Sequence, residues 1–482
     1  MTQQVNTAEK KEQAFSTINA KAFITVVAIL TAILLISGTL SYFVPQGTFQ
    51  RDDTGTILID TYVQGQVSGI AFWRVLTAPV RVFATSDGVT IISISVFLLI
   101  MSGIFNLLEK TGGVKTFIVQ IMNRLRDRTG VVICITTLIF MMFGSLFGMF
   151  EELVTLLPLI IVFMLSLGMD TMLGLGTCLM AACFGFTTAI TNPFSVGIAS
   201  QYAGVQTASG VWLRLVFFVI VYACVCGFML LYMRKIRRKP QASLTYEQDR
   251  QRRESLQDVS DAPPEDQNRI FNIYAGFFAI QGVLLVLIAS IRAISGLAIP
   301  ILAASFLIFG LGASMLVCKQ PKRVLYWFYQ GAVAMLPAVL MIAIASSIKL
   351  VMEESGIIDT IMYMVLQLLQ GSNKFVAILL IYALILFLQL FIGSATAKIV
   401  LVMPIVVPIA KAMGISPTLV ILTYCMADGF TDVIIPTNPV LLIGLSMANV
   451  SYTKWVKWTW KLQLLVFAIS ILILLFGVAI GY

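Results

Sequence analysis

The sequence predicts an all-α polytopic membrane protein with two inverted-topology repeats, each containing a re-entrant hairpin and a broken transmembrane helix. Composition, an internal repeat and the distribution of charge predict this fold. Hydrophobic residues make up 59% of the 482 residues, charged residues only 11%, and the mean hydropathy is +0.95. A soluble globular chain carries about 25% charged residues, so most of this chain is expected to lie in a membrane.

The internal repeat can be read without gaps. Thr191-Asn192-Pro193 recurs as Thr437-Asn438-Pro439, and 437 − 191 = 246. Between residues 153 and 198, the same shift gives 11 identities in 46 positions, above the chance expectation for two apolar segments. A second match, 109–112 with 353–356, lies at offset 244. The chain is therefore interpreted as a duplicated membrane protein, and an interrupted apolar segment in each half indicates a transporter binding site.

Apolar runs supply the expected membrane helices. Stretches of about 20 uncharged residues can cross a hydrocarbon core of about 30 Å. Backbone groups in lipid must be hydrogen-bonded within the protein, which leaves helices or a closed barrel, and the absence of period-2 alternation excludes the barrel. The runs are 22–44, 88–108, 130–150, 215–233, 270–291, 293–318, 375–397 and 462–482.

The net charge of +9 comes from Lys and Arg residues at the ends of apolar runs. Positive charge in this position orients helices towards the cytoplasm, so it predicts topology and argues against a nucleic-acid partner. The N-terminus is then cytoplasmic and the C-terminus outside, in a multi-pass protein of the inner (cytoplasmic) membrane. The clusters are 110–128, 234–239, 319–323 and 454–461.

The first apolar run is expected to be a retained helix. It is long for a signal peptide, and it ends in Tyr42-Phe43-Val44-Pro45 in place of a cleavage site. All seven cysteines lie inside apolar runs, which indicates structural thiols and not disulfides or metal ligands. The chain contains no histidine, which removes imidazole from any metal site or proton relay.

The first half ends in a hairpin and a broken helix. Residues 130–150 enter the membrane and 153–169 return. A full span with a short return would fit, but a re-entrant hairpin is favoured because it buries its polar tip in protein. A broken helix over 171–210 and helix 211–233 come next. The elements before them are a cytoplasmic tail 1–21, helix 22–44, an external segment 45–65, an aromatic arm 71–83, helix 88–108 and a basic surface helix 113–128.

The second half is expected to repeat this order upside down. The charged segment 234–269 is interpreted as a solvated linker, and one additional helix, 270–291, inverts the second repeat relative to the first. The surface segment 351–371 is acidic and external, whereas its counterpart 113–128 is basic and internal, which supports inversion. The remaining elements are helix 293–318, an arm at 326–329, helix 331–350, hairpin 375–411, broken helix 415–450 and helix 459–481.

The hairpin tips and helix breaks are the predicted binding elements. A helix broken in the membrane exposes N–H groups that favour an anion and carbonyls that favour Na⁺ or an ammonium. A pair of proline kinks in packing helices is the alternative. The expected binding residues are Ser145, Gly148, Thr188, Thr191, Asn192 and Pro193 in the first half, and Gly393, Ser394, Thr396, Thr437, Asn438 and Pro439 in the second. Na⁺ could bind at Ser145, Thr188 and Asn192, and at Ser394, Thr396 and Asn438.

Five ionisable residues lie near these elements: Glu151, Glu152, Lys398, Asp428 and Asp432. Ionisable residues inside a membrane are expensive and usually functional. Glu152 and Lys398 are equivalent, since 398 − 152 = 246, and Asp428 and Asp432 share a helix face that points at the break. We expect these five residues to contact substrate. Alternatively, the glutamates reach the cytoplasmic surface and the aspartates pair with Lys398.

Three motifs are distinctive in combination: Gly-Met-Phe-Glu-Glu at 148–152, Met-Ala-Asp-Gly-Phe-Thr-Asp at 426–432, and Ser-Tyr-Phe-Val-Pro-Gln-Gly-Thr-Phe at 41–49. Together they resemble the YfcC-like branch of the C4-dicarboxylate anaerobic carrier family, within the broader ion transporter superfamily. The resemblance implies the elevator fold of divalent-anion/sodium symporters and a homodimer. The domains would be a tail 1–21, scaffold 22–128 and 270–371, transport domain 130–234 and 374–482, and a cytoplasmic linker 235–269.

The expected function is secondary active transport of a small charged metabolite, with no further cofactor than Na⁺ or H⁺ as coupling ion. The tips read Gly-Ser-Leu-Phe-Gly and Gly-Ser-Ala-Thr-Ala, which depart from the Ser-Asn-Thr signature of the dicarboxylate symporters. Four acidic residues against one lysine favour a positively charged substrate, so we expect an amino acid, preferably basic, moved by antiport or ion coupling. A Na⁺- or H⁺-coupled C4-dicarboxylate carrier is the alternative.

Three other classes are less consistent with the sequence. A channel would show a continuous polar pore, whereas the polar residues here cluster at two symmetric breaks. An intramembrane enzyme is disfavoured because the chain lacks histidine and any catalytic serine motif. A membrane scaffold protein would not need paired Asn-Pro breaks.

Overall fold

The structure, a computed structural model, describes residues 20–50, 61–85, 88–113, 116, 128–150, 152–257, 264–290 and 298–482. Nearly all of the expected tail 1–21 and most of the basic helix 113–128 lie outside these residues. Almost all of the described chain is helical. Within it, the strands are β1 (Gly47–Thr48) and β2 (Val63–Gln64), which pair antiparallel in the segment after the first helix.

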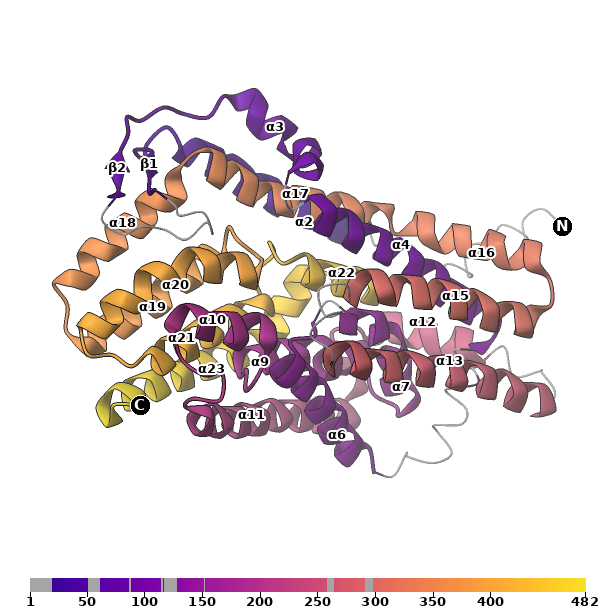
Figure 1. The fold of residues 1–482 in the computed structure, drawn as a ribbon. Coiled ribbons are helices and arrows are strands. Elements are labelled where there is room, and N and C mark those ends of the chain that lie inside the picture. The colour runs from indigo at the N-terminus through magenta and orange to yellow at the C-terminus, as the bar shows by residue number, and fades with distance from the viewer. Residues whose placement is uncertain are drawn as a thin grey trace.

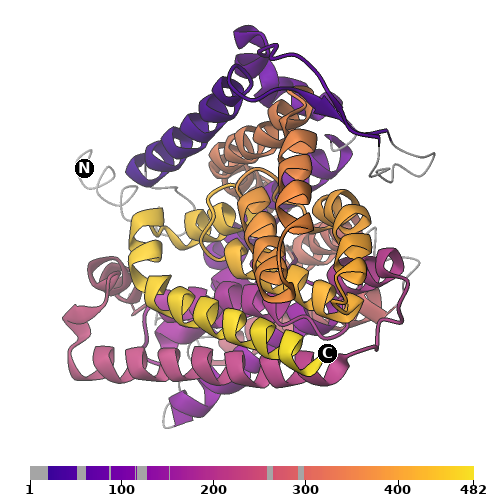
Figure 2. The same cartoon turned by 90° about the vertical axis from the view of Figure 1, so that its left-hand side faces the viewer.

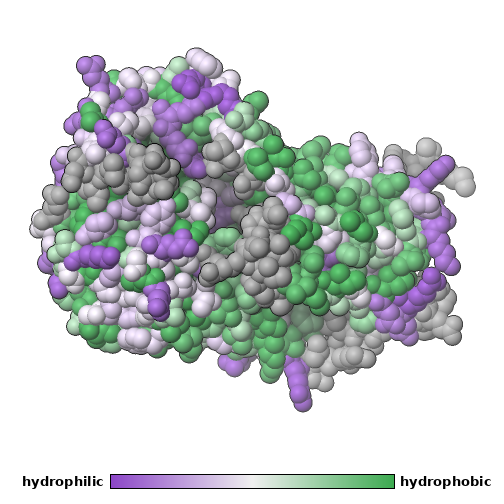
Figure 3. Space-filling view, viewed as in Figure 1, coloured by the Kyte–Doolittle hydropathy of each residue, from purple (hydrophilic) through white to green (hydrophobic). Residues whose placement is uncertain are grey.

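The long helices lie side by side along the long axis of the molecule (Figure 1). By length and composition, seven helices in the described ranges could cross a membrane. Figure 3 shows a broad hydrophobic surface over the central part of the molecule, with hydrophilic residues gathered towards the two ends. The chain is an all-helical, multi-span membrane protein. The long elements outside the hairpins are α2 (Ala20–Leu40), α4 (Gly88–Lys110), α11 (Val211–Arg238), α13 (Pro264–Ser290), α15 (Ala298–Cys318), α16 (Pro321–Ala334), α17 (Leu336–Glu354) and α23 (Tyr452–Ile480).

The aromatic segment 326–329, expected as a separate arm, is instead the middle of helix α16. Pro321 opens this helix, and a turn at Met335 separates it from α17. α16 packs against α4, where Ser102 Oγ donates to the Gly331 carbonyl at 2.7 Å and Asn106 Nδ2 donates to the Trp327 carbonyl at 2.6 Å. A first-half helix and a second-half helix are thereby joined along much of their length.

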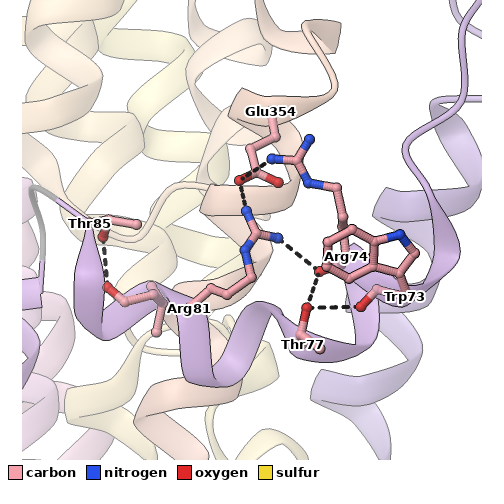
Figure 4. A network of polar contacts seen from close by, with 7 residues as sticks. Trp73, Arg74, Thr77, Arg81, Thr85 and Glu354 are labelled. Carbon is pink, nitrogen blue, oxygen red and sulfur yellow. Dashed lines mark hydrogen bonds and ion pairs between the residues drawn. The ribbon is translucent and has the colours of Figure 1, made fainter.

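The two halves also meet at the end of the molecule that carries the strands. Glu354, the last residue of α17, accepts hydrogen bonds from Arg74 and Arg81 of α3 (Phe72–Arg81), as Figure 4 shows. Beyond it, the rings of Tyr62 and Tyr363 stack with their centroids 3.9 Å apart; Tyr363 belongs to α18 (Ile357–Gln370). The two segments expected outside, 45–65 and 351–371, therefore lie at the same end.

Each half contains one helical hairpin and one interrupted helix. Figure 2 shows α23 and α11 running alongside these elements. In the first half the elements are α6 (Thr129–Met142), the π-turn η4 (Phe143–Phe147), η5 (Glu152–Leu156), α7 (Leu157–Ser166), α8 (Thr171–Leu175), η6 (Gly176–Met180), α9 (Ala181–Thr187), η7 (Pro193–Gly197) and α10 (Ile198–Ala203). In the second half they are α19 (Lys374–Gln389), α20 (Ala395–Ala412), α21 (Pro417–Asp432) and α22 (Pro439–Ala448).

The offset of 246 found in the sequence recurs in the backbone. Gly168 and Gly414 both have positive φ, at 77° and 72°, in the turn before an interrupted helix. Two residues later, Asp170 and Ser416 cap the helices that begin at Thr171 and Pro417. The repeat is therefore carried by matched turns and caps as well as by matched side chains.

The segment expected as a solvated linker is not solvated throughout: that expectation is wrong for Thr245, Asp249 and Arg252, whereas Glu247, Arg250 and Gln251 are exposed. Helix α12 (Tyr246–Gln257) buries Asp249 and Arg252, each only 2% exposed. Asp249 accepts the Thr171 N–H at 2.9 Å. Arg252 donates to Thr171 Oγ1 at 3.0 Å and to the Ala448 carbonyl at 2.9 Å. We call this arrangement the α12 clamp, because it holds the start of α8 against the end of α22.

A second buried carboxylate supports the same end of α8. Asp170 accepts hydrogen bonds from Leu173 N at 2.9 Å, Tyr232 OH at 2.6 Å and Ser243 Oγ at 2.7 Å. Burial raises the pKa of the Asp170 carboxyl above its ordinary value, although these three hydrogen bonds act in the opposite direction. The connector between the halves thus contributes buried, hydrogen-bonded polar groups to the base of the interrupted helices.

Candidate functional site

The first break agrees closely with the sequence expectation. α9 ends at Thr187 and the next helical turn begins at Pro193, the residue after Asn192. The Asn192 side-chain oxygen accepts from Phe194 N at 2.9 Å and Ser195 N at 3.2 Å, and its Nδ2 donates to the Gly144 carbonyl at 3.3 Å. One side chain therefore caps the resumed helix and ties it to the hairpin tip.

Ser145 at the tip completes the connection. Its carbonyl accepts the N–H groups of Ile190 at 3.0 Å, Thr191 at 3.3 Å and Asn192 at 3.1 Å. Its hydroxyl donates to the Thr188 carbonyl at 2.7 Å. The tip and the break of the first half thus form one unit, in which most of the polar groups are hydrogen-bonded to one another.

Gly148 closes this tip in a conformation that only glycine adopts easily. Its φ is 69°, and a Cβ there would lie 2.2 Å from Asn192 Oδ1. The tip can approach the capping asparagine only because this position lacks a side chain.

Arg214, at the start of α11, was not among the predicted residues. It is 2% exposed and donates to three backbone carbonyls: Ile190 at 2.6 Å, Thr207 at 2.6 Å and Ser209 at 2.7 Å. The guanidinium satisfies a carbonyl that the helix break exposes. A single arginine near the beginning of a helix whose other charged residues all lie in its last turns was the available signal.

The second break has the same backbone plan with charged side chains around it. Asn438 Oδ1 accepts from Val440 N at 2.9 Å and Leu441 N at 3.4 Å, so Asn438 caps α22 as Asn192 caps η7. Its Nδ2 donates to Asp432 Oδ1 at 2.7 Å. Gln389 Nε2, at the end of α19, donates to the same oxygen at 2.7 Å. Gln389 is fully buried and was also not predicted; it is a lone amide in an apolar run.

A buried ion pair lies beside this second break. Lys398 of α20 pairs with Asp428 of α21, and the two residues are 0% and 1% exposed. Tyr424, one turn before Asp428, donates to the Ala395 carbonyl at 2.6 Å and so fixes the first turn of α20. Of the alternative in which the aspartates pair with Lys398, the structure shows the pair with Asp428, and Asp432 Oδ1 accepts from two amides.

The two breaks lie close together. A Cβ at Gly429 of α21 would lie 2.2 Å from the backbone nitrogen of Thr187, the last residue of α9. Interrupted helices from opposite halves therefore touch backbone to backbone beside both breaks.

The remaining predicted residues lie around the two tips and breaks. Thr437 is buried and donates to the Gln389 carbonyl at 3.3 Å, Thr191 is exposed and donates to the Leu146 carbonyl at 3.0 Å, and Gly393 lies across from the Thr437 carbonyl. Ser394 is exposed and caps α20, Thr396 is half-buried, Pro439 opens α22, and Thr188 bonds back to Phe184. Glu151 and the side chains of Glu152 and Pro193 lie outside the described part of the chain.

Five of the six side chains considered for Na⁺ already have hydrogen-bond partners: Ser145, Thr188, Asn192, Ser394 and Asn438. Asn438 Oδ1 and Ser394 Oγ accept N–H groups at the first turns of α22 and α20. Helix N-termini carry partial positive charge, so these positions favour an anionic group over a cation. In the first half, Thr188 Oγ1 donates to the Phe184 carbonyl at 2.8 Å. Sodium at either set would compete with existing hydrogen bonds.

Sequence comparison identifies relatives over most of the chain. The profile of the C4-dicarboxylate anaerobic carrier (DcuC) family matches residues 21–479. A Haemophilus influenzae protein named only as uncharacterized is 27% identical over 373 residues, 76% of this chain and 71% of the relative. An Escherichia coli protein named "Putative basic amino acid antiporter YfcC" is 26% identical over 406 residues, 82% of this chain and 79% of the relative.

Among solved structures, two transporters resemble the chain weakly. The Alcanivorax borkumensis YdaH transporter has a TM-score of 0.44 at 18% identity and covers 95% of this chain and 98% of its own. The Neisseria gonorrhoeae MtrF structure has a TM-score of 0.42 at 14% identity and covers 97% of this chain and 96% of its own.

Proposed function

Because this chain belongs to the C4-dicarboxylate anaerobic carrier family, a family of secondary transporters and not of enzymes, we propose that it carries an amino acid, preferably a basic one. Transport would occur across the cytoplasmic membrane by exchange or with a coupling ion. The substrate would bind where the two hairpin tips and the two helix breaks meet.

The buried carboxylates at the second break carry this proposal. Two buried carboxylates, Asp428 and Asp432, lie within one helical turn of each other, and one lysine, Lys398, is paired with the first. Charges buried in a membrane protein are expensive and are usually kept for function. Two carboxylates buried within one turn of a helix support a substrate that carries positive charge. The name of the Escherichia coli relative, which refers to a basic amino acid antiporter, supports the same substrate class.

The proposed mechanism is an elevator. The scaffold would comprise 22–128 and 270–371, supported by the α4–α16 contact and by Glu354, which join the halves there. The transport domain would comprise 130–234 and 374–482, supported by the hydrogen bonds between tips and breaks. In this proposal the hairpins are re-entrant, the repeats are inverted, the N-terminus is cytoplasmic and the protein is a homodimer.

A C4-dicarboxylate carrier is the second candidate. The family description favours it, and so does one feature of the site. The N-termini of α20 and α22 and the ammonium of Lys398 are all groups that attract carboxylates.

Counterflow in proteoliposomes decides between the two. Vesicles are preloaded with unlabelled arginine, ornithine, succinate or fumarate, with and without Na⁺, and uptake of labelled substrate is measured. We expect labelled arginine to accumulate against preloaded ornithine without Na⁺. Accumulation only with dicarboxylates and Na⁺ would reverse the assignment.

Substitution of the asparagine at the second break tests whether transport depends on that break. Asn438→Ala removes both the α22 cap and a donor to Asp432, so uptake is expected to fall at least about tenfold, with a stability loss of about 1 kcal/mol. Asn373→Ala is the matched control, because Asn373 caps α19 through Val376 N at 3.0 Å in an exposed position. It should lose similar stability and keep transport. Equal transport losses in both variants would contradict a role for the break.

A further inference from the structure

The Lys398–Asp428 pair differs from a typical structural ion pair. Beyond the pair itself, neither the Lys398 ammonium nor the second Asp428 oxygen has a hydrogen-bond partner among the residues that the structure describes. An ammonium has three donors and a carboxylate about four acceptor positions. Buried charges are normally stabilised by several hydrogen bonds in addition to their counter-ion. The pair is therefore enclosed but incompletely bonded.

Other buried charges in the molecule show what complete bonding looks like. Arg214 donates to three carbonyls, and Asp170 accepts from three donors. Asp249 in the α12 clamp likewise accepts from Thr171 N, Thr171 Oγ1 and Thr245 Oγ1. Charged side chains elsewhere in the described chain also have a buried atom without a hydrogen-bond partner, Arg253 Nε and Glu354 Oε2 among them. At Lys398 and Asp428, by contrast, both members of one ion pair lack hydrogen bonds beyond the pair.

The surroundings of the pair add a further open acceptor. One turn beyond Asp428, Asp432 is held by the amides of Gln389 and Asn438. The side-chain oxygen of Gln389 is buried and has no hydrogen-bond partner within the described ranges. Asp428 Oδ2 and Gln389 Oε1 are both acceptors, which suits a ligand with several N–H donors. The N-terminus of α20, which carries Lys398, suits the ligand's anionic group.

We propose that the Lys398–Asp428 ion pair recognises a substrate head group carrying both a cation and a carboxylate, and that such a substrate opens the pair. The inference rests on the proposed function and narrows it. The cationic group of the substrate replaces Lys398 at Asp428, and its carboxylate pairs with the released ammonium. One internal ion pair becomes two intermolecular pairs, and no buried charge loses its partner.

Ligands with only one kind of charge cannot make this exchange. A dicarboxylate pairs with Lys398 but leaves Asp428 beside further negative charge. A diamine pairs with Asp428 but leaves Lys398 without a counter-ion. Because an unpaired buried charge is strongly unfavourable, the pair selects amino acids over dicarboxylates and diamines. When no substrate is bound, Lys398 and Asp428 neutralise each other, so the site needs no Na⁺. Such selection by a penalty on the wrong ligand is a common source of specificity.

Agmatine, which is arginine without its carboxylate, is the probe that tests this. Proteoliposomes preloaded with arginine are offered labelled arginine or labelled agmatine. Wild type is expected to exchange arginine and to reject agmatine. In Lys398→Met, no ammonium has to be neutralised, so the agmatine-to-arginine uptake ratio should rise at least about tenfold. Lys398→Arg keeps the charge and should keep the preference of the wild type.

A matched control lies on the same helix. Lys411 of α20 donates to the Ala203 carbonyl at 3.0 Å, away from the pair, so Lys411→Met should reject agmatine as wild type does. If Lys398→Met exchanges arginine and still rejects agmatine, the inference falls while the proposed function stands. If wild type exchanges only dicarboxylates, both fall.

Binding is measured separately in case the variant no longer moves. Thermal unfolding of detergent-purified Lys398→Met is measured with arginine or agmatine added. Stabilisation by agmatine in the variant, and not in wild type, supports recognition of the carboxylate by Lys398. A variant that folds but is stabilised by neither ligand overturns it.

Discussion

At the level of single residues, Gly148 is the position where the first tip depends most on the absence of a side chain. Gly148→Ala combines two costs: a positive φ, worth about 1–2 kcal/mol for a non-glycine residue, and a Cβ placed 2.2 Å from Asn192 Oδ1. We expect the Asn192 cap to be displaced and substrate uptake to fall at least about tenfold.

Gly168→Ala is the control for this prediction. Its φ is 77°, but nothing lies within 4 Å of its would-be Cβ. Gly168→Ala should lower the unfolding temperature only through the backbone strain of its positive φ. The transport rate per folded molecule should remain that of wild type. If both variants transport equally when corrected for folded protein, contact between tip and break is not required.

The sequence alone predicts the two capping asparagines, but it does not predict the buried polar residues that support the same breaks. Asn192 and Asn438 stood out because an Asn-Pro pair stops a helix and the tripeptide is repeated. Gln389 and Arg214 carry no repeat and no motif. Their roles depend on Asp432 and on the Ile190 carbonyl, which only the tertiary fold brings within reach.

At the level of elements, the α12 clamp is the feature whose removal should be most visible in stability. Arg252→Ala leaves the Ala448 carbonyl without its guanidinium donor and Asp249 without a nearby cation. Removing one member of a buried charged network costs roughly 3–5 kcal/mol. We expect a clear drop in the thermal unfolding temperature of the purified protein.

Arg250→Ala tests the same helix without the buried contacts. Arg250 is paired with Glu247 at 3.1 Å, and its side chain is 55% exposed. Exposed pairs of this kind contribute about 0.2–1 kcal/mol, so the unfolding temperature should hardly change. A similar drop in both variants would mean that α12 helicity matters and the clamp does not.

Elements with a strong apolar pattern were predictable, whereas α12 was not. The long helices and both breaks can be derived from uncharged runs and Asn-Pro pairs. The α12 sequence, Tyr-Glu-Gln-Asp-Arg-Gln-Arg-Arg-Glu-Ser-Leu-Gln, has the composition of a solvated segment. Its burial depends on hydrogen bonds to residues as distant as Ala448, 196 positions further along the chain. Composition alone cannot show that polar side chains are buried when their burial depends on hydrogen bonds to residues far away in the sequence.

For the whole molecule, the proposed boundary between scaffold and transport domain makes a direct prediction. Met335, between α16 and α17, and Met447, near the end of α22, line one small cavity of about 40 Å³ together with residues of α4 and α7. Met335→Cys with Met447→Cys, in a background with the seven native cysteines replaced, should be bridged by Hg²⁺. If the two domains move past each other, bridging should stop transport, and excess thiol should restore it.

A pair within the proposed scaffold provides the comparison. Tyr62 and Tyr363 stack with their centroids 3.9 Å apart, and both belong to segments assigned to the scaffold. Tyr62→Cys with Tyr363→Cys should be bridged by Hg²⁺ without loss of transport. Full transport with the Met335–Met447 pair bridged would exclude relative motion at that boundary.

The α12 clamp also has a consequence for biogenesis. The ribosome makes α12 long before α22, because Arg252 precedes Ala448 by 196 residues, whereas Asp249 comes only 78 residues after Thr171. Domains tend to fold from the N-terminus during synthesis. The Asp249 contacts can therefore form while the second half is still being translated, and Arg252 obtains the Ala448 carbonyl only after that half has been inserted. A chain truncated before α22 keeps an arginine that lacks this acceptor.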